Sequence, residues 1–156
     1  MIKIWAHPGA GKTHFYQLHP ELVIDFDSVY KDRLSRELNI PETYEARKEW
    51  RKTHREEYNN KLVDLFNEAI VDCYSSGKIL LVSDLLILQE YSCDIDFVIQ
   101  MSEETFKQRT LQRNEPWDLK HQLWKQDIDN AINSIRQDKV FQYDGYLSDL
   151  FKNETI

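Results

Sequence analysis

The stretch that decides the fold stands at the start of the chain, where residues 1–13 read M-I-K-I-W-A-H-P-G-A-G-K-T. Its opening residues predict a short strand. The remainder, from Ala6 to Thr13, follows the phosphate-binding pattern G-x-x-x-x-G-K-[ST], with Ala6 in place of the first glycine. Gly9 and Gly11 let backbone N–H groups turn inward around a phosphate, where a Cβ would obstruct them. The order strand, loop and helix favours this interpretation over an ordinary glycine-containing turn.

The side chains at the end of this loop indicate ATP and Mg²⁺ as cofactors. Lys12 supplies a cation for the β- and γ-phosphates, and the hydroxyl of Thr13 can ligate Mg²⁺. The helix predicted over residues 11–18 directs its N-terminus at the anion. We therefore expect ATP to be held by residues of this loop and the helix start: His7, Pro8, Gly9, Ala10, Gly11, Lys12, Thr13 and His14.

The composition predicts one domain over residues 1–156, with 41% hydrophobic and 30% charged residues. No apolar run reaches membrane-spanning length and the N-terminus lacks the shape of a signal peptide, so we expect a cytoplasmic protein without a membrane partner. Cys73 and Cys93 have no ligand-like spacing and are predicted to be reduced core residues. The net charge of −7 disfavours broad binding to nucleic acid, but it leaves a small nucleotide open because local charge decides that.

Strand-like and helix-like segments alternate along the whole chain, which predicts an α/β fold with a parallel sheet. Further strands are expected at residues 22–26, 78–84, 97–101 and 140–143. Helices are expected at residues 28–38, 42–74, 103–113 and 116–137, with a short one near Ser148. The sequence therefore predicts a three-layer α/β/α architecture around a five-stranded parallel sheet, with room for only a short lid between the last two long helices.

Carboxylates follow two of the predicted strands. Asp25 and Asp27 close the second strand, and Asp84 closes the strongly apolar third one. Ligands in open α/β sheets bind beyond the carboxyl ends of the strands, so these groups are expected near the transferring phosphate. One carboxylate can organise Mg²⁺ and another can accept a proton from an attacking hydroxyl. Helix capping is the alternative role for each of them.

Two arginines occupy one face of the helix expected at residues 103–113. Arg109 and Arg113 lie four residues apart and follow the fourth strand closely. Arginines in such a place stabilise the charge that develops during phosphoryl transfer. The alternative is a solvated pair whose partners are Glu104 or Glu115.

A basic cluster stands out in an otherwise acidic chain. Its members, the cations of the first half of the long helix, are Arg47, Lys48, Arg51, Lys52 and Arg55. They alternate with Trp50, His54 and Tyr58, and cations beside aromatic rings suit a phosphate together with a base or sugar. The alternative is a solvated helix face whose cations pair with neighbouring glutamates.

The order of these features resembles the small P-loop kinases, which include nucleoside monophosphate kinases, shikimate and gluconate kinases, and the kinase domain of polynucleotide kinases. Residues 24–27, I-D-F-D, are similar to the D-x-D motif of shikimate-type kinases. That resemblance implies that Asp25 assists Mg²⁺ and that Asp27 binds or deprotonates the acceptor hydroxyl, as the general base of polynucleotide kinases does. Residues 97–113 are similar to a nucleotide-kinase segment, in which Arg109 would approach the adenine and Arg113 the phosphates.

The resemblance covers most of the chain and implies a P-loop NTPase fold. Residues 40–60 fall outside it, and we expect them to form an acceptor-binding helical segment. The D-G-x-P-R segment that adenylate kinases carry after the third strand is absent, and S-D-L-L stands at residues 83–86. The small size and short lid are similar to nucleotide kinases encoded by bacteriophages.

These observations predict an enzyme that transfers a phosphoryl group from ATP with Mg²⁺ to a nucleoside monophosphate or deoxynucleotide. In this interpretation Lys12, Asp27, Arg109 and Arg113 are catalytic, Thr13, Asp25 and Asp84 hold the metal, and the acceptor contacts Asp27, Arg47, Arg51, Arg55 and Asp84. One alternative is a kinase that acts on a hydroxyl of a nucleic acid or of a modified nucleobase or nucleoside. Another is a nucleotide-dependent switch or binding module without an acceptor. The sequence leaves the donor base and the oligomeric state open.

Overall fold

The computed structural model describes residues 2–151, apart from the side chain of Tyr44, and its centre is a five-stranded parallel sheet. The strands lie in the order β2-β3-β1-β4-β5, and every adjacent pair is parallel. Their bounds are Lys3–Ala6 for β1, Val23–Asp25 for β2, Ile79–Val82 for β3, Phe97–Gln100 for β4 and Val140–Gln142 for β5. The predicted α/β class and five-stranded parallel sheet are therefore confirmed.

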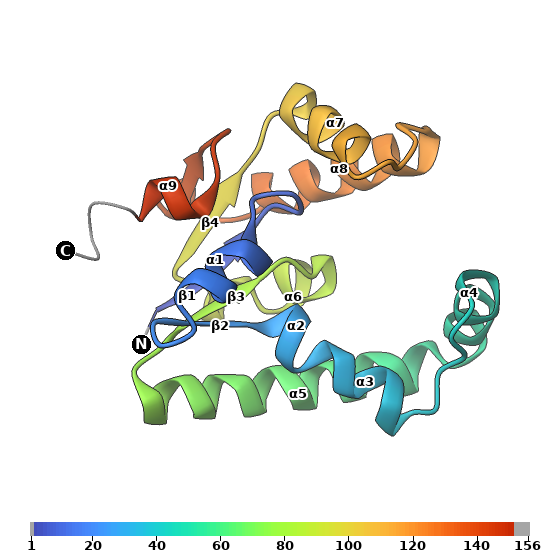
Figure 1. Ribbon diagram of the computed structural model, residues 1–156. Helices are drawn as coiled ribbons and strands as arrows, with labels where there is room; N and C mark the ends of the chain where they lie inside the picture. The colour runs from blue at the N-terminus through green and yellow to red at the C-terminus, as the bar shows by residue number, and fades with distance from the viewer. Residues whose placement is uncertain (1, 152–156) are drawn as a thin grey trace.

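Helices cover both faces of the sheet and complete three layers (Figure 1). Their bounds are Lys12–Leu18 for α1, Phe26–Val29 for α2, Lys31–Glu37 for α3, Tyr44–Thr53 for α4, Arg55–Ser76 for α5, Leu85–Glu90 for α6, Glu103–Gln112 for α7, Leu119–Asn133 for α8 and Leu147–Leu150 for α9. Short 3₁₀ turns stand at Ser92–Asp94 and Gln137–Lys139. None of the helices within residues 2–151 is long and apolar enough to cross a bilayer.

The two faces of the sheet carry separate cores, because successive side chains of a strand point to opposite faces. On one face Trp5 of β1 is buried with residues of α5 and α8, including Phe66 and Ile128. On the other face Ile4 of the same strand is buried with Phe15 of α1 and with residues of α7 and α9. Strand β1 is thus buried on both sides, and the loop that follows it starts from the most rigid part of the molecule.

The prediction of one continuous helix over residues 42–74 is wrong, because α4 and α5 are separate helices that meet at His54. The hydroxyl of Thr53 donates to the carbonyl of Trp50 at 3.1 Å, and the His54 ring stacks on the Trp50 ring at 4.5 Å. Side chains that hydrogen-bond the last carbonyls of a helix compete with its continuation. The three arginines expected to contact the acceptor are therefore divided between two helices, with Arg47 and Arg51 on α4 and Arg55 on α5.

Other boundaries differ because carboxylates cap helices where the sequence reading did not place a start. The side chain of Asp25 accepts a hydrogen bond from the backbone N–H of Asp27, so α2 begins at the end of β2. Tyr30 then separates α2 from α3, where the sequence predicted one helix. Asp84 starts the short helix α6, which the sequence did not predict. Asp118 caps α8, which begins at Leu119 and not at Pro116.

The cysteines depart from expectation at one position. Cys73 is buried as predicted, whereas Cys93 is exposed, and neither forms a disulfide within the described residues. Cys93 lies in the 3₁₀ turn Ser92–Asp94, outside the two cores.

Phe66 tests the packing of α5 on the sheet. It is fully buried and its ring packs edge-on against Phe26 at 5.8 Å. Removing a buried ring leaves a cavity, so Phe66→Ala should lower the free energy of unfolding by about 3–5 kcal/mol. Val71→Ala on the same helix is the control, since Val71 is 62% exposed and its loss should change stability by less than about 0.5 kcal/mol. Urea unfolding of the two variants measures both, and equal effects would contradict this packing.

Candidate active site

Residues 6–13, which we call the glycine loop, connect β1 to α1 in a conformation that only glycine accepts easily. Gly9 and Gly11 have φ angles of 91° and 85°, in the left-handed region. A Cβ on Gly11 would stand 3.0 Å from the ring of Tyr146, and one on Gly9 would stand 3.3 Å from the Cβ of Arg109. The glycines thus permit both the turn and the close approach of α7 and of the segment before α9.

Arg109 holds this loop from behind. Its guanidinium donates to the carbonyl of Gly9 and, at 2.8 Å, to the carbonyl of Asp144, and it lies over the Tyr146 ring at 3.7 Å from the centroid. The residue is only 9% exposed. The backbone N–H of Leu147 also donates to Ala10 in the loop at 2.9 Å. The structure therefore makes Arg109 a positioning residue that joins the glycine loop to the end of the chain.

Arg113 lies one turn further along and is different in character. It caps the C-terminus of α7, its side chain is 45% exposed, and its closest carboxylate is that of Glu115 at 3.9 Å. It lines the same cavity as Lys12. The sequence analysis assigned different roles to the two arginines, and the structure places them differently: Arg109 is fixed in the wall of the loop by hydrogen bonds, whereas Arg113 is half exposed.

The imidazole ring of His7 is buried under the glycine loop. Its Nδ1 shares a hydrogen bond with the carbonyl of Pro8 at 2.9 Å, and its Nε2 is buried without a hydrogen-bond partner among the described residues. Burial lowers the pKa of His7 to about 4, so the ring is neutral at pH 7. Both His7 and Ala10 are buried beneath the loop, and only their backbone groups could serve the expected nucleotide.

Lys12 connects the loop to the acidic residues that follow β2. Its ammonium lies 2.9 Å from the Oδ2 of Asp27 and 3.6 Å from the Oδ1 of Asp25. Asp25 is fully buried, and its Oδ2 also accepts from the hydroxyls of Thr13 at 3.3 Å and Ser28 at 2.8 Å. The sequence prediction that Lys12, Thr13, Asp25 and Asp27 lie together is confirmed by these contacts.

These contacts fit Mg²⁺ at one position, the hydroxyl of Thr13. Asp25 faces the Thr13 hydroxyl from behind, so the hydroxyl is directed by a carboxylate, as an oxygen that ligates a hard cation requires. No group of three or more His, Cys, Asp or Glu residues within residues 2–151 has the geometry of a metal cage. Mg²⁺ suits such a site because it keeps several waters and takes its other ligands from phosphates.

Asp84 is engaged elsewhere. Its Oδ1 accepts from the N–H of Leu86 at 2.9 Å at the start of α6, and its Oδ2 accepts from Lys31 at 2.9 Å. It is absent from the linings of both cavities described below, as far as residues 2–151 define them. Asp84 thus acts through Lys31 in this structure, and the helix cap that the sequence left as an alternative is observed.

Lys31 is the residue that the sequence analysis missed. It stands 2.9 Å from Asp84 and 3.9 Å from the Oδ1 of Asp27. Burial lowers the pKa of Lys31, but the two carboxylates raise it by more, so its pKa lies above the usual range and the ammonium is charged. Its position four residues after Asp27 on a helix was the available signal.

Two cavities meet at Asp27 and Lys31. The loop cavity, of about 500 Å³, is lined by the glycine loop together with Arg109, Arg113 and Tyr146. The basic cavity, of about 760 Å³, is lined by residues of α3, α4 and α5 together with Lys120 of α8. Asp27 and Lys31 line both. Both side chains are therefore available to a ligand in either cavity.

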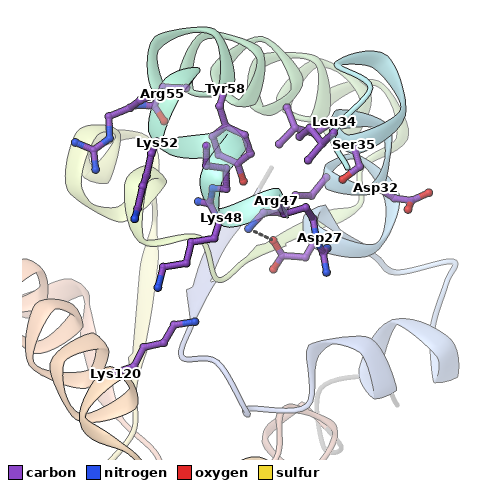
Figure 2. A pocket seen from close by; sticks show the side chains of 14 residues that line it. Asp27, Asp32, Leu34, Ser35, Arg47, Lys48, Lys52, Arg55, Tyr58 and Lys120 are labelled. Carbon is purple, nitrogen blue, oxygen red and sulfur yellow. Dashed lines mark ion pairs between the residues drawn. The ribbon is translucent and has the colours of Figure 1, made fainter. Parts of the chain in front are cut away.

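The basic cavity collects the cations that the sequence singled out (Figure 2). Its lining includes the whole predicted cluster, which is Arg47, Lys48, Arg51, Lys52 and Arg55. The guanidinium of Arg51 lies 4.4 Å above the ring of Tyr58, which forms part of the wall. Helix α4 carries most of the cluster and lies away from the sheet, beyond α3 (Figure 1). The break at His54 thus directs a basic helix toward the second cavity.

The burial of His7 predicts a pH dependence of stability. The unfolded chain protonates this ring below its ordinary pKa of 6.5, whereas the folded chain does so only near pH 4. The unfolded state therefore binds more protons in this interval, and stability falls as the pH falls from about 6.5 to about 4, by about 3 kcal/mol in all. His7→Gln should show a shallower fall between pH 7 and pH 4.5 in urea unfolding. Parallel curves for the two proteins would contradict a neutral buried ring.

Arg109 and Arg113 should separate in their effects on stability. Arg109→Ala removes charged hydrogen bonds from a buried guanidinium to two backbone carbonyls and should cost about 2–4 kcal/mol. Arg113→Ala is the matched control, because its side chain is half exposed, and should cost less than about 0.5 kcal/mol. Thermal unfolding measures both. Equal losses, or a larger loss for Arg113→Ala, would show that Arg109 does not hold the loop.

Comparisons with known proteins assign no family to the chain. No protein-family model matches the chain, and no curated protein matches it. Among solved structures, TT1252 from Thermus thermophilus aligns with 99% of this chain and 93% of its own length, at 14% sequence identity and a TM-score of 0.48. We therefore infer function from the geometry of this chain.

Proposed function

We propose that the chain is a kinase that transfers the γ-phosphoryl group of ATP, bound in the loop cavity, to a nucleotide bound in the basic cavity. The observation that carries the proposal is the meeting of the two cavities at Asp27 and Lys31. One cavity presents a glycine loop with its lysine, and the other presents a cluster of cations. A donor and an acceptor held this way face each other across one carboxylate and one ammonium.

Lys12 is the residue through which ATP would engage the site. It rests on Asp27 and Asp25, and a triphosphate that enters the loop cavity competes for the same ammonium. When Lys12 turns to the phosphates, Asp27 loses its closest cation and its carboxylate becomes available to the acceptor. ATP binding and activation of Asp27 are then parts of a single rearrangement.

The residues present fit Mg²⁺ at Thr13. Its hydroxyl would ligate the ion, and Asp25 would orient that hydroxyl and supply negative charge from behind it. Bound Mg²⁺ neutralises phosphate charge during the transfer. Lys31 and Arg113 line the loop cavity and provide further positive charge. Lys31 lies beside Asp27, and the side chain of Arg113 is half exposed.

The acceptor chemistry depends on Asp27. A phosphate acceptor needs no general base, and a nucleoside monophosphate is the acceptor that the sequence suggested. A hydroxyl acceptor needs a group that takes its proton. Asp27 favours the hydroxyl, because its carboxylate would repel a dianionic phosphate at the point of attack. The kinase that acts on a hydroxyl is thus the candidate that Asp27 supports over transfer to a monophosphate.

The rival of another class is a nucleotide-dependent switch or binding module. Such a protein needs the loop cavity alone, and the basic cavity with its shared Asp27 would have no task in it. A kinase uses both and should work in the cytoplasm, where ATP is available. ATP turnover that depends on an added acceptor distinguishes the two classes.

Lys12→Ala tests the proposal. Because Lys12 is the cation of the loop, its removal should lower phosphoryl transfer by at least about 10²-fold. Lys107→Ala is the control, since Lys107 is exposed on α7 and lines neither cavity. Transfer of labelled phosphate from ATP to a mixture of nucleosides, nucleotides and short oligonucleotides measures it, with circular dichroism to confirm folding. A folded Lys12→Ala protein with turnover like that of Lys107→Ala would refute the kinase.

A further inference from the structure

The charge of the basic cavity exceeds what one phosphate requires. Seven lysines and arginines line it against two aspartates, an excess of five positive charges in a chain whose net charge is −7. A nucleoside monophosphate offers a single phosphate group. We propose that the acceptor is a nucleotide with a free hydroxyl as its reacting group and two or more phosphate groups elsewhere in the molecule. This inference rests on the proposed function and deepens it.

The five cations that α4 and α5 contribute to this cavity are not engaged by carboxylates within the described residues. Within residues 2–151, the five basic residues of the cluster on α4 and α5 form no ion pair, although Glu45, Glu49, Glu56 and Glu57 are on the same helices. Neighbouring α3 shows the opposite pattern, since its Arg33 pairs with Glu37 and with Glu68 of α5. A solvated face laced with ion pairs therefore does not describe α4, and its charges are open to an anion.

These cations stand on more than one wall. Figure 2 shows Lys48 and Lys120 extending into the opening from opposite sides. Arg55 follows the break at His54 and reaches the cavity from α5. One phosphate group contacts two or three such side chains at most. A ligand that satisfies cations on separate walls must carry phosphates at separate places.

The reacting end is fixed by Asp27. Its Oδ1 is buried without a hydrogen-bond donor in the described residues, while Lys12 pairs with the Oδ2 at 2.9 Å and Lys31 lies 3.9 Å from the Oδ1. An acceptor hydroxyl supplies the missing donor. Its oxygen then bonds to the γ-phosphorus, the bond from that phosphorus to the β-phosphate oxygen breaks, and ADP leaves. The hydroxyl proton passes to the Asp27 carboxylate, so the step is balanced.

The test is a series of acceptors that differ in phosphate number, at saturating ATP and Mg²⁺. The series comprises a nucleoside, a nucleoside monophosphate, a pyrophosphate-bridged dinucleotide, and a trinucleotide and hexanucleotide with hydroxyl ends. We expect kcat/KM for acceptors with two or more phosphates to exceed that for the monophosphate by at least about tenfold. With about three phosphates engaged, the logarithm of the affinity should fall with the logarithm of salt concentration with a slope of about −2. The bridged dinucleotide and the oligonucleotides distinguish a small ligand from a nucleic-acid end.

The matched variants separate cavity charge from total charge. Arg47→Gln with Lys48→Gln removes two cavity cations, and Lys107→Gln with Arg136→Gln removes two exposed cations from other surfaces. The first pair should raise KM for a trinucleotide at least about tenfold and leave ATP affinity unchanged, and the second pair should change neither. Asp27→Asn should lower kcat for every hydroxyl acceptor by about 10²-fold.

Each outcome decides one of the two proposals. A monophosphate as good as every larger acceptor, or equal effects of the two double variants, overturns the multiphosphate acceptor and leaves the kinase in place. Transfer to the phosphate of the monophosphate, with Asp27→Asn active, overturns the hydroxyl assignment. Absence of transfer to the entire series, with ATP bound equally by the wild type and Lys12→Ala, overturns the proposed function itself.

Discussion

The ion pair between Lys12 and Asp27, at 2.9 Å, is the contact on which the rest of this site depends. Lys12 is the first residue of α1, which follows β1, and Asp27 lies in the first turn of α2, which follows β2. The ion pair therefore joins the ends of two strands that β3 separates in the sheet. The buried carboxylate of Asp25 also contacts the Lys12 ammonium. Asp27 also lines the basic cavity, so the carboxylate that pairs with Lys12 belongs to both cavities.

The loop itself is a consequence of packing around it. Strand β1 is buried on both faces, and Arg109 and the N–H of Leu147 bind the loop carbonyls that would otherwise be left without donors. Gly9 and Gly11 adopt positive φ angles in this loop, and the N–H of Ala10 donates to the carbonyl of His7 within it at 3.0 Å. The loop is therefore held in shape before any ligand binds, which lowers the ordering cost of binding.

Local patterns predicted much of this molecule, and long-range contacts account for what they missed. The apolar strands and the glycine loop have strong local signals, so the sheet and the gathering of Lys12, Thr13, Asp25 and Asp27 were predicted. The break at His54 depends on how its ring stacks on Trp50, and the inward turn of Arg109 depends on a carbonyl 100 residues earlier in the chain. Lys31 is held by Asp84, which caps α6 and lies 53 residues further along the chain. Sequence periodicity carries no signal for such distant partners. Arg109 was therefore expected to contact the nucleotide, and its hydrogen bonds to the loop were not predicted.

The central claim is that the glycine loop binds phosphate and takes Lys12 from Asp27. A crystal structure with Mg²⁺ and a non-hydrolysable ATP analogue tests it most directly. The account predicts phosphates within hydrogen-bond distance of the loop N–H groups and the Lys12 ammonium, with Lys12 no longer paired to Asp27 and the Thr13 hydroxyl on the metal. A nucleotide bound away from residues 6–13, or Lys12 still paired to Asp27 beside a bound triphosphate, would contradict it.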